Sequence, residues 1–230
     1  MPNLTLIQPL KRENLREVVH ARLCDLILKG GIEPGQSVTV ASLSSALQVS
    51  PMPIREAMSR LVDAGALTRL SGRSMGVPKL TRAELDDLTR VRREIEGRAV
   101  SWAVAHQDPA LLATLDAIFA RMTVAEKAAD NPAFINLNYQ LHFAIYERSG
   151  SDLLLGIIRN LWLRITPYFH MLDAEGHLKV SNDIHARLLA SIRARDAEAA
   201  TACLHEDIDR AYAKLAGFLF ASRDQHGTAP

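Results

Sequence analysis

The sequence predicts a mainly α-helical protein in two parts, an N-terminal winged helix-turn-helix followed by a C-terminal, all-α, antiparallel helical bundle. The first part is indicated by residues 43–67, where two short amphipathic segments meet at a tight turn, and by two strand-like runs just after them. The second part is indicated by apolar residues that recur at helical spacing from Thr81 almost to the end of the sequence. We expect the domains to span residues 1–78 and 79–230.

One helix and one turn precede the helix-turn-helix. Apolar residues recur at helical spacing from about residue 10 to 29, and Gly30-Gly31 ends the pattern. Pro34-Gly35 is typical of a turn, and it leads into a short extended piece at residues 37–40.

The helix-turn-helix has the features of a DNA-reading element. Ser50 is expected to cap the second helix, with Pro51 in its first turn, where a missing N–H does no harm. An arginine near the start of that helix suits insertion into a major groove. Strands at residues 66–70 and 75–78 then form a wing. The exposed candidates for DNA contact are Ser44, Ser45, Ser50, Met52 and Arg55, together with Gly72 and Arg73 at the tip of the wing.

The C-terminal part is expected to contain about six helices and no strand. Thr81 and Glu84 form a capping box, so a helix begins there. Asp108-Pro109 and Asn131-Pro132 each pair a capping residue with a proline at the first helical position. Further breaks are predicted at residues 149–151, 175–176 and 195–196.

Composition supports a DNA-binding head on a separate body. Residues 1–82 contain 11 Lys and Arg against 6 Asp and Glu, whereas the remainder contains 16 against 20. Cys24 and Cys203 lie far apart in helical patterns, which favours buried free thiols over a disulfide. No stretch approaches the roughly 20 apolar residues that cross a bilayer, so we expect a cytoplasmic protein with no membrane partner.

Enzyme motifs are incomplete. The sequence His205-Glu206-Asp207-Ile208-Asp209 lacks the final histidine of a zinc-protease motif, and one Glu17…His20 pair does not make a di-iron site. No glycine-rich phosphate loop or Gly-x-Ser-x-Gly motif is present. A metal-binding helical-bundle enzyme remains an alternative, but a DNA-binding regulator is favoured.

The N-terminal third resembles the winged-helix domain of the GntR family of bacterial transcription regulators. The resemblance rests on residues 18–40, 48–67 and 69–80, which include an Ile-x-Pro-Gly motif and a Pro-Ile-Arg-Glu-Ala motif. The rest of the chain resembles the all-helical, ligand-binding FCD domain of the FadR-like subfamily. The protein is therefore expected to be a regulator, a repressor of metabolic genes, that binds a pseudo-palindromic DNA operator as a homodimer.

The resemblance also implies roles for the DNA-contacting residues. In the family the arginine that corresponds to Arg55 reads a base, and arginine is suited to guanine in the major groove. The alternative is a surface pair with Glu56 or Asp63. Most members have an arginine where this chain has Pro51, and Met52 replaces a hydroxyl residue, so we expect a different or weaker operator. Ser44 and Ser45 would touch phosphate, with plain solvent exposure as an equal alternative.

The resemblance further implies a divalent metal site in the helical domain. Asn138 and His142 correspond to an Asp and a His one turn apart, and His185 corresponds to the third ligand. The fourth ligand is Asp207 or His205, and we favour Asp207; a two-residue step rotates a helix by about 200°, so only one of them faces the site. This mixed set suits Zn, Ni, Fe or Mn. The alternatives are core histidines, or a site that has lost its metal.

The effector implied by the resemblance is a small carboxylic acid beside the metal. Arg92 corresponds to the family arginine that neutralises it, and Arg164 is a second candidate; a guanidinium binds a carboxylate with two parallel hydrogen bonds. The alternative for Arg92 is a surface ion pair with Glu96. On binding, the acid would shift the first helix of the effector domain and thereby the spacing of the two DNA-binding heads.

Overall fold

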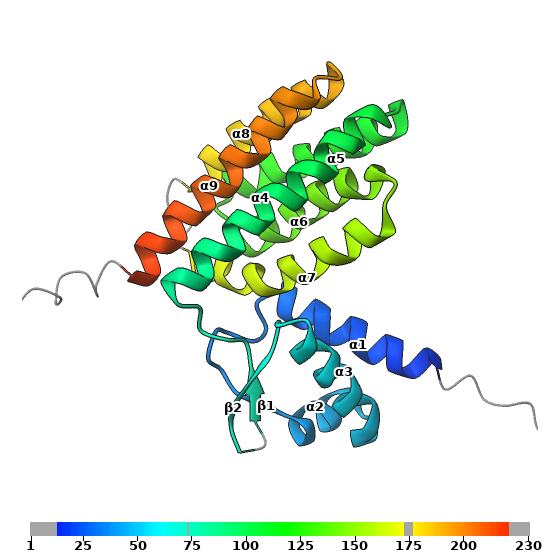
Figure 1. Cartoon of the computed structure of the whole chain (residues 1–230), viewed down its shortest axis with the longest axis vertical. Helices are drawn as coiled ribbons and strands as arrows, with labels where there is room; N and C mark the ends of the chain where they lie inside the picture. Colours follow the sequence, from blue (N-terminus) through cyan, green and yellow to red (C-terminus); the bar gives the residue numbers. More distant parts are fainter. Residues whose placement is uncertain (1–12, 73, 173–176, 221–230) are drawn as a thin grey trace, which may run out of the picture.

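A computed structural model describes residues 13–72, 74–172 and 177–220. The N-terminal head begins with one long helix and a short strand, and two helices and two strands complete it (Figure 1). The expected winged helix-turn-helix is confirmed. Its elements are α1 (Glu13–Leu28), β1 (Val38–Thr39), α2 (Val40–Leu47), α3 (Pro51–Asp63), β2 (Thr68–Ser71) and β3 (Ser74–Gly76).

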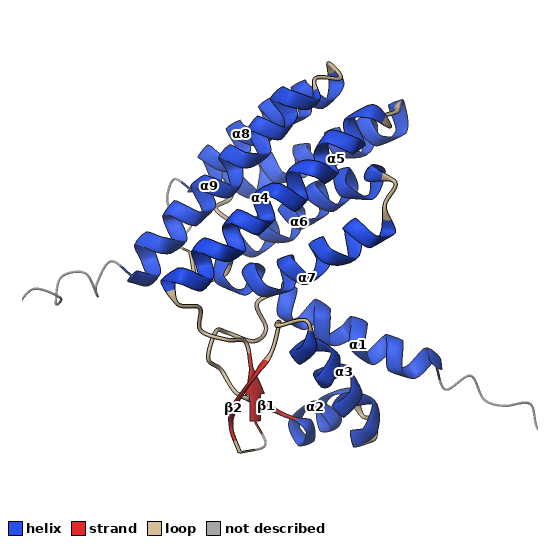
Figure 2. Ribbon diagram, viewed as in Figure 1, coloured by secondary structure: helices blue, strands red, loops and turns tan. Residues whose placement is uncertain are grey.

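The wing is a small antiparallel sheet in the order β1-β3-β2, with Val38 opposite Met75 and Thr68 opposite Gly76. Figure 2 shows that the strands all lie in the head. Gly76 is buried where β3 passes close to the segment before β1: a Cβ atom at this position would lie 2.1 Å from the Gln36 carbonyl oxygen. The sheet thus joins the wing to β1, the strand that leads into α2.

The described residues after the head are mainly helical, as predicted, and their helices pack as an antiparallel bundle (Figure 1). Capping sets several of the starts: the Thr81–Glu84 capping box forms, and the Asp108 side chain accepts a hydrogen bond from the Leu111 N–H. The helices are α4 (Arg82–Ala105), α5 (Pro109–Lys127), α6 (Asn131–Tyr146), α7 (Asp152–Phe169), α8 (His177–Arg193) and α9 (Ala197–Phe220), with a 3₁₀ turn at Glu147–Ser149.

Two capping expectations were wrong in detail. Ser50 occupies the capping position of α3 in extended geometry, but its side chain makes no capping hydrogen bond. The cap of α6 is Asp130 rather than Asn131, because the Asp130 carboxylate accepts from the Ala133 N–H while Asn131 already lies inside the helix. Asn131 instead donates its side-chain N–H to the Leu172 carbonyl.

Helix α7 joins the two parts of the molecule. It lies between the bundle and α1 in Figure 1, and its buried residues Leu161, Ile165 and Tyr168 belong to the same apolar cluster as the core of the head. The Tyr168 hydroxyl accepts a hydrogen bond from the Leu80 N–H at 2.8 Å and donates one to the Pro78 carbonyl. It therefore binds α7 to residues 78–80, which connect the two parts. No helix in the described ranges is long and apolar enough to cross a membrane.

Candidate functional sites

The face of α3 that the sequence predicts to read DNA is exposed. Ile54, Met58 and Leu61 are buried against the head, and the opposite face leaves Met52 62% exposed and Arg55 exposed beside it. The predicted alternative pairing of Arg55 does not occur: Glu56 instead binds Arg16 at 2.9 Å, and within the described ranges Arg55 forms no ion pair. Its guanidinium is therefore available to a ligand.

A groove runs between α3 and the wing, and it contains one basic residue that the sequence analysis missed. Arg55 and Ser59 of α3 line one side, while Arg69 and Gly72 line the other. Arg69 is exposed on β2, and its position two residues before the wing turn was the only pattern that could have pointed to it. Arg55 and Arg69 give this groove the positive charge that suits a phosphate backbone.

The other predicted DNA contacts divide by exposure. Ser45 and Ser50 are exposed, and Gly72 has no heavy atom within 4 Å of the position of a Cβ. The expected phosphate contact of Ser44 is not supported. Its hydroxyl oxygen is buried and has no hydrogen-bond partner in the described residues, so it is not presented to phosphate. Arg73 lies outside the described residues.

Three predicted metal ligands converge from three different helices. His142 of α6, His185 of α8 and Asp207 of α9 place one ligand atom each within 4.8 Å of one another. The His142 Nε2 lies 3.2 Å from the His185 Nε2 and 3.4 Å from Asp207 Oδ2, and the His185 Nε2 lies 3.6 Å from Asp207 Oδ1. Both imidazoles are buried. Such a compact nitrogen and oxygen set is typical of a transition-metal site.

Protonation at this cluster favours a cation. Burial lowers the pKa of His142, which keeps the imidazole neutral. Burial alone would raise the pKa of Asp207, but its close contacts with the imidazoles of His185 and His142 outweigh burial and hold its pKa well below the usual value. A carboxylate and the neutral imidazole of His142 thus lie beside His185 in one small space. The geometry fits a divalent ion, whose ligands must be deprotonated.

Asn138 supplies a further observation in favour of a bound group. It lines the cavity beside the cluster, and its side-chain oxygen is buried without a hydrogen-bond partner in the described part of the chain. An unsatisfied buried oxygen is costly, at about 1–3 kcal/mol, so its presence calls for a ligand or water. Ser181 donates to Asp207 Oδ1 at 3.0 Å and orients that carboxylate; the sequence analysis did not identify it.

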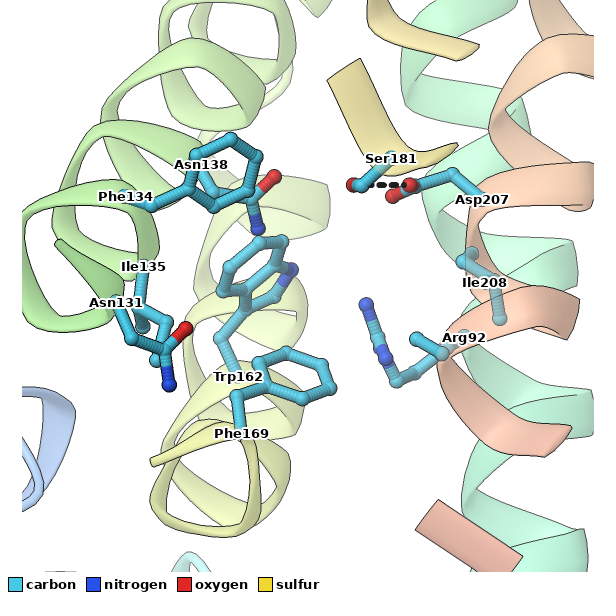
Figure 3. Close-up of a pocket in the computed structure, with 11 residues that line it drawn as sticks. Arg92, Asn131, Phe134, Ile135, Asn138, Trp162, Phe169, Ser181, Asp207 and Ile208 are labelled. Carbon is cyan, nitrogen blue, oxygen red and sulfur yellow. Dashed lines mark hydrogen bonds between the residues drawn. The ribbon is translucent and has the colours of Figure 1, made fainter. Parts of the chain in front are cut away.

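The cavity beside the cluster is small and has a basic side (Figure 3). Its volume of about 40 Å³ has room for roughly three water molecules or a small acid. In Figure 3 the Arg92 guanidinium points into this space toward the Trp162 ring, whose centre lies 5.4 Å away. Phe134 and Phe169 complete the apolar side, and helical spacing alone did not distinguish these aromatics from ordinary core residues.

Arg92 is not the surface residue of the alternative interpretation. It is 5% exposed, and its Nε donates to Glu96 Oε1 at 2.7 Å, with Glu96 fully buried. Burial alone would lower the pKa of Arg92, but its contacts with Glu96 raise it overall, so the guanidinium stays charged. A buried arginine that faces a cavity is suited to bind an anion.

Two other residues lie away from the cavity. Arg164 does not line it; its Nε lies 3.5 Å from the position that a Cβ of Gly65 would take, just after the end of α3. The proposed effector contact by Arg164 is therefore not supported by its position. His205, the competing fourth ligand, instead contacts the Arg93 carbonyl through Nε2 at 3.0 Å, so it faces α4 and not the cluster.

A winged helix joined to a helical bundle with a buried His/Asp cluster defines a two-part DNA-binding regulator. Comparison with known proteins agrees: residues 15–77 match the family model for bacterial regulatory proteins of the gntR family, and residues 87–210 match that of the FCD domain. The chain belongs to the GntR family and carries an FCD domain. Like its named relatives, it is a transcriptional regulator and not an enzyme.

Among curated relatives, the transcriptional regulator McbR of Escherichia coli K12 is 34% identical over 182 residues, covering 77% of this chain and 81% of that protein. The repressor GlaR of the same organism is 27% identical over 199 residues, covering 79% and 87%. The solved structure of E. coli McbR/YncC superimposes with a TM-score of 0.82 at 30% identity, covering 91% of this chain and 98% of that one. A GntR regulator structure from Rhodococcus sp. RHA1, at 21% identity, shares the fold with a TM-score of 0.74 over 89% and 98% of the two chains.

Proposed function

We propose that this regulator senses a small carboxylic acid and represses metabolic genes until that acid binds. Residues 1–78 would form the DNA-binding domain and residues 79–230 the effector-binding and dimerisation domain. The observation that carries the proposal is the cavity that Arg92 and Asp207 both line, because Asp207 is also a member of the compact His142/His185/Asp207 cluster. A repressing role is supported by GlaR, a relative that is named a repressor.

The proposed metal is a divalent transition ion, Zn, Ni, Fe or Mn, held by His142, His185 and Asp207 with the amide oxygen of Asn138 as a further ligand. When bound, the ion supplies positive charge and an open coordination position for the carboxylate. Arg92 would then bind the other side of the acid, and the aromatic wall of Trp162 and Phe169 would exclude acids with bulky polar groups.

DNA binding is proposed for a homodimer, because one helix-turn-helix reads only one half-site and two-fold symmetry produces a pseudo-palindromic operator. Arg55 would read a base, while Arg69, Ser45 and the wing would contact the backbone. Pro51 and Met52 cannot supply the charged contact that most family members make there. The proposed site of action is the cytoplasm, where a bacterial operator lies.

Coupling between the two sites is proposed to run through α7 rather than through the first effector-domain helix alone. Trp162 and Phe169 of α7 line the cavity, whereas Tyr168 and His170 at its end hold the head. The His170 Nε2 lies 3.0 Å from the Leu28 carbonyl at the end of α1. A ligand that moves the aromatic wall therefore acts on the same helix that carries the head.

The experiment that tests this proposal measures operator affinity with and without acids. Duplexes are selected from a random pool, and the zinc-loaded chain is then titrated with the best duplex by fluorescence anisotropy in the presence of small mono- and dicarboxylates. We expect at least one acid to change the Kd by roughly 5–150-fold. Arg92→Lys keeps the charge but loses the two-pronged geometry, so it should abolish that response. An acid that binds in the cavity and leaves the Kd unchanged would contradict the proposal.

A further inference from the structure

A continuous row of buried hydrogen bonds connects the effector arginine to a metal ligand. The Arg92 Nε donates to Glu96 Oε1 at 2.7 Å, and the Tyr146 hydroxyl donates to Glu96 Oε2 at 2.6 Å. The Tyr146 oxygen lies 3.0 Å from the His142 Nδ1. Glu96 and Tyr146 are both 0% exposed, and His142 is 1% exposed, so water does not compete for these bonds.

The chemical nature of these four side chains determines which atom donates and which accepts in each hydrogen bond of the row. Glu96 is paired with the always-protonated Arg92, so its carboxylate accepts hydrogen bonds. Tyr146 uses its single O–H on Glu96, which leaves only its oxygen lone pairs for His142. The His142 Nδ1 must therefore carry the proton and donate it to Tyr146. A neutral imidazole has one N–H, so the Nε2 of His142 bears the lone pair.

That lone pair faces the cluster, where the Nε2 of His185 and the carboxylate of Asp207 lie 3.2 and 3.4 Å away. The orientation and the tautomer are those that a metal ligand requires. A histidine ligand normally donates its other N–H to a carboxylate, a carbonyl or water; here a tyrosine relays that contact to a carboxylate on a different helix, α4.

We infer that Tyr146 and Glu96 are positioning residues of the candidate metal site: together they hold His142 in the tautomer that presents Nε2 to the ion, and Glu96 simultaneously orients Arg92 toward the acid. This inference deepens the proposed function and rests on it. Because the Glu96 carboxylate binds both Arg92 and Tyr146, it fixes the position of the effector arginine relative to the metal ligand His142. Neither residue touches the ion, so their effect reaches the ion only through His142.

The test compares zinc affinity in Tyr146→Phe with the wild type. The substitution removes one oxygen and keeps the ring in place. Glu96 Oε2 still accepts a hydrogen bond from Arg92 Nη2 at 3.3 Å, so the fold should survive. Tyr139→Phe is the matched control, because Tyr139 lies on the same helix and packs on Phe143 outside the row. Competition with a chromophoric zinc chelator should show roughly 10–100-fold weaker binding for Tyr146→Phe and less than twofold change for the control.

A second measurement reads the tautomer in the metal-free full-length protein. Long-range ¹H–¹⁵N spectra should show His142, assigned by the loss of its signals in His142→Gln, as the Nδ1–H form in the wild type and as a mixture of tautomers in Tyr146→Phe. If the wild type binds no zinc, the proposed metal fails while the tautomer spectrum still tests the row. An Nε2–H tautomer in the wild type, or equal zinc affinity in both proteins, overturns the inference.

Discussion

Removing the Tyr168 hydroxyl should loosen the connection between the two domains. In Tyr168→Phe two hydrogen bonds are lost, one from the Leu80 N–H at 2.8 Å and one to the Pro78 carbonyl. Each is worth about 1 kcal/mol net, and a buried Leu80 N–H left without an acceptor costs about 1–3 kcal/mol. Since these losses overlap at Leu80, we expect the free energy of unfolding to fall by about 2–3 kcal/mol.

For a chain of this size that loss lowers the Tm by roughly 4–12 °C. The assay is thermal unfolding by circular dichroism, with Tyr212→Phe as the control, because the Tyr212 hydroxyl also bonds a partner, Asp86, but at the surface. The same variant should show a smaller effect of the acid on operator affinity, since α7 loses its two hydrogen bonds to the connection. A Tm within 1 °C of the wild type, together with an unchanged acid response, would refute the reasoning.

Three further predictions concern the head and the metal site. Arg55→Ala should lose about 1–3 kcal/mol of discrimination between operator and scrambled duplex while weak, salt-sensitive binding remains; anisotropy at two salt concentrations measures this, and unchanged discrimination would remove Arg55 from the base readers. His142→Ala should lose zinc binding in equilibrium dialysis yet keep the oligomeric state of the wild type by light scattering, and retained zinc would place the ligands elsewhere. Gly76→Ala should cost about 1–3 kcal/mol or more and impair operator binding, because the new methyl group would meet the Gln36 carbonyl at 2.1 Å. Gly217→Ala, with open space around it, is the control, and equal stability of the two variants would contradict the packing argument.

Local patterns predicted the fold well because the elements are strongly marked at their ends. The capping box at Thr81 and the aspartate-proline pair at Asp108 set helix starts through short-range hydrogen bonds that the sequence displays directly. At Asn131 the same rule was off by one residue, since Asp130 is an equally good cap and tertiary contact with Leu172 engages the Asn131 side chain.

The candidate metal cluster was accessible from the sequence through the resemblance to the FCD domain, and helix geometry then excluded one of His205 and Asp207. The environment of Arg92 was not, because an i, i+4 pair with Glu96 looks the same in sequence whether solvent or three neighbouring helices surround it. The same holds for Arg164 and Ser44, whose positions depend on packing between elements distant in the chain. The role of α7 as the element shared by cavity and head likewise arises only from tertiary structure.

The proposed sensing mechanism depends most directly on a metal ion at His142, His185 and Asp207. The decisive measurement is elemental analysis of the protein purified without a histidine tag or chelator. We expect about one equivalent of a single transition metal per chain. A folded protein that binds DNA and contains no metal, and that takes up none from a zinc-containing buffer, would contradict it.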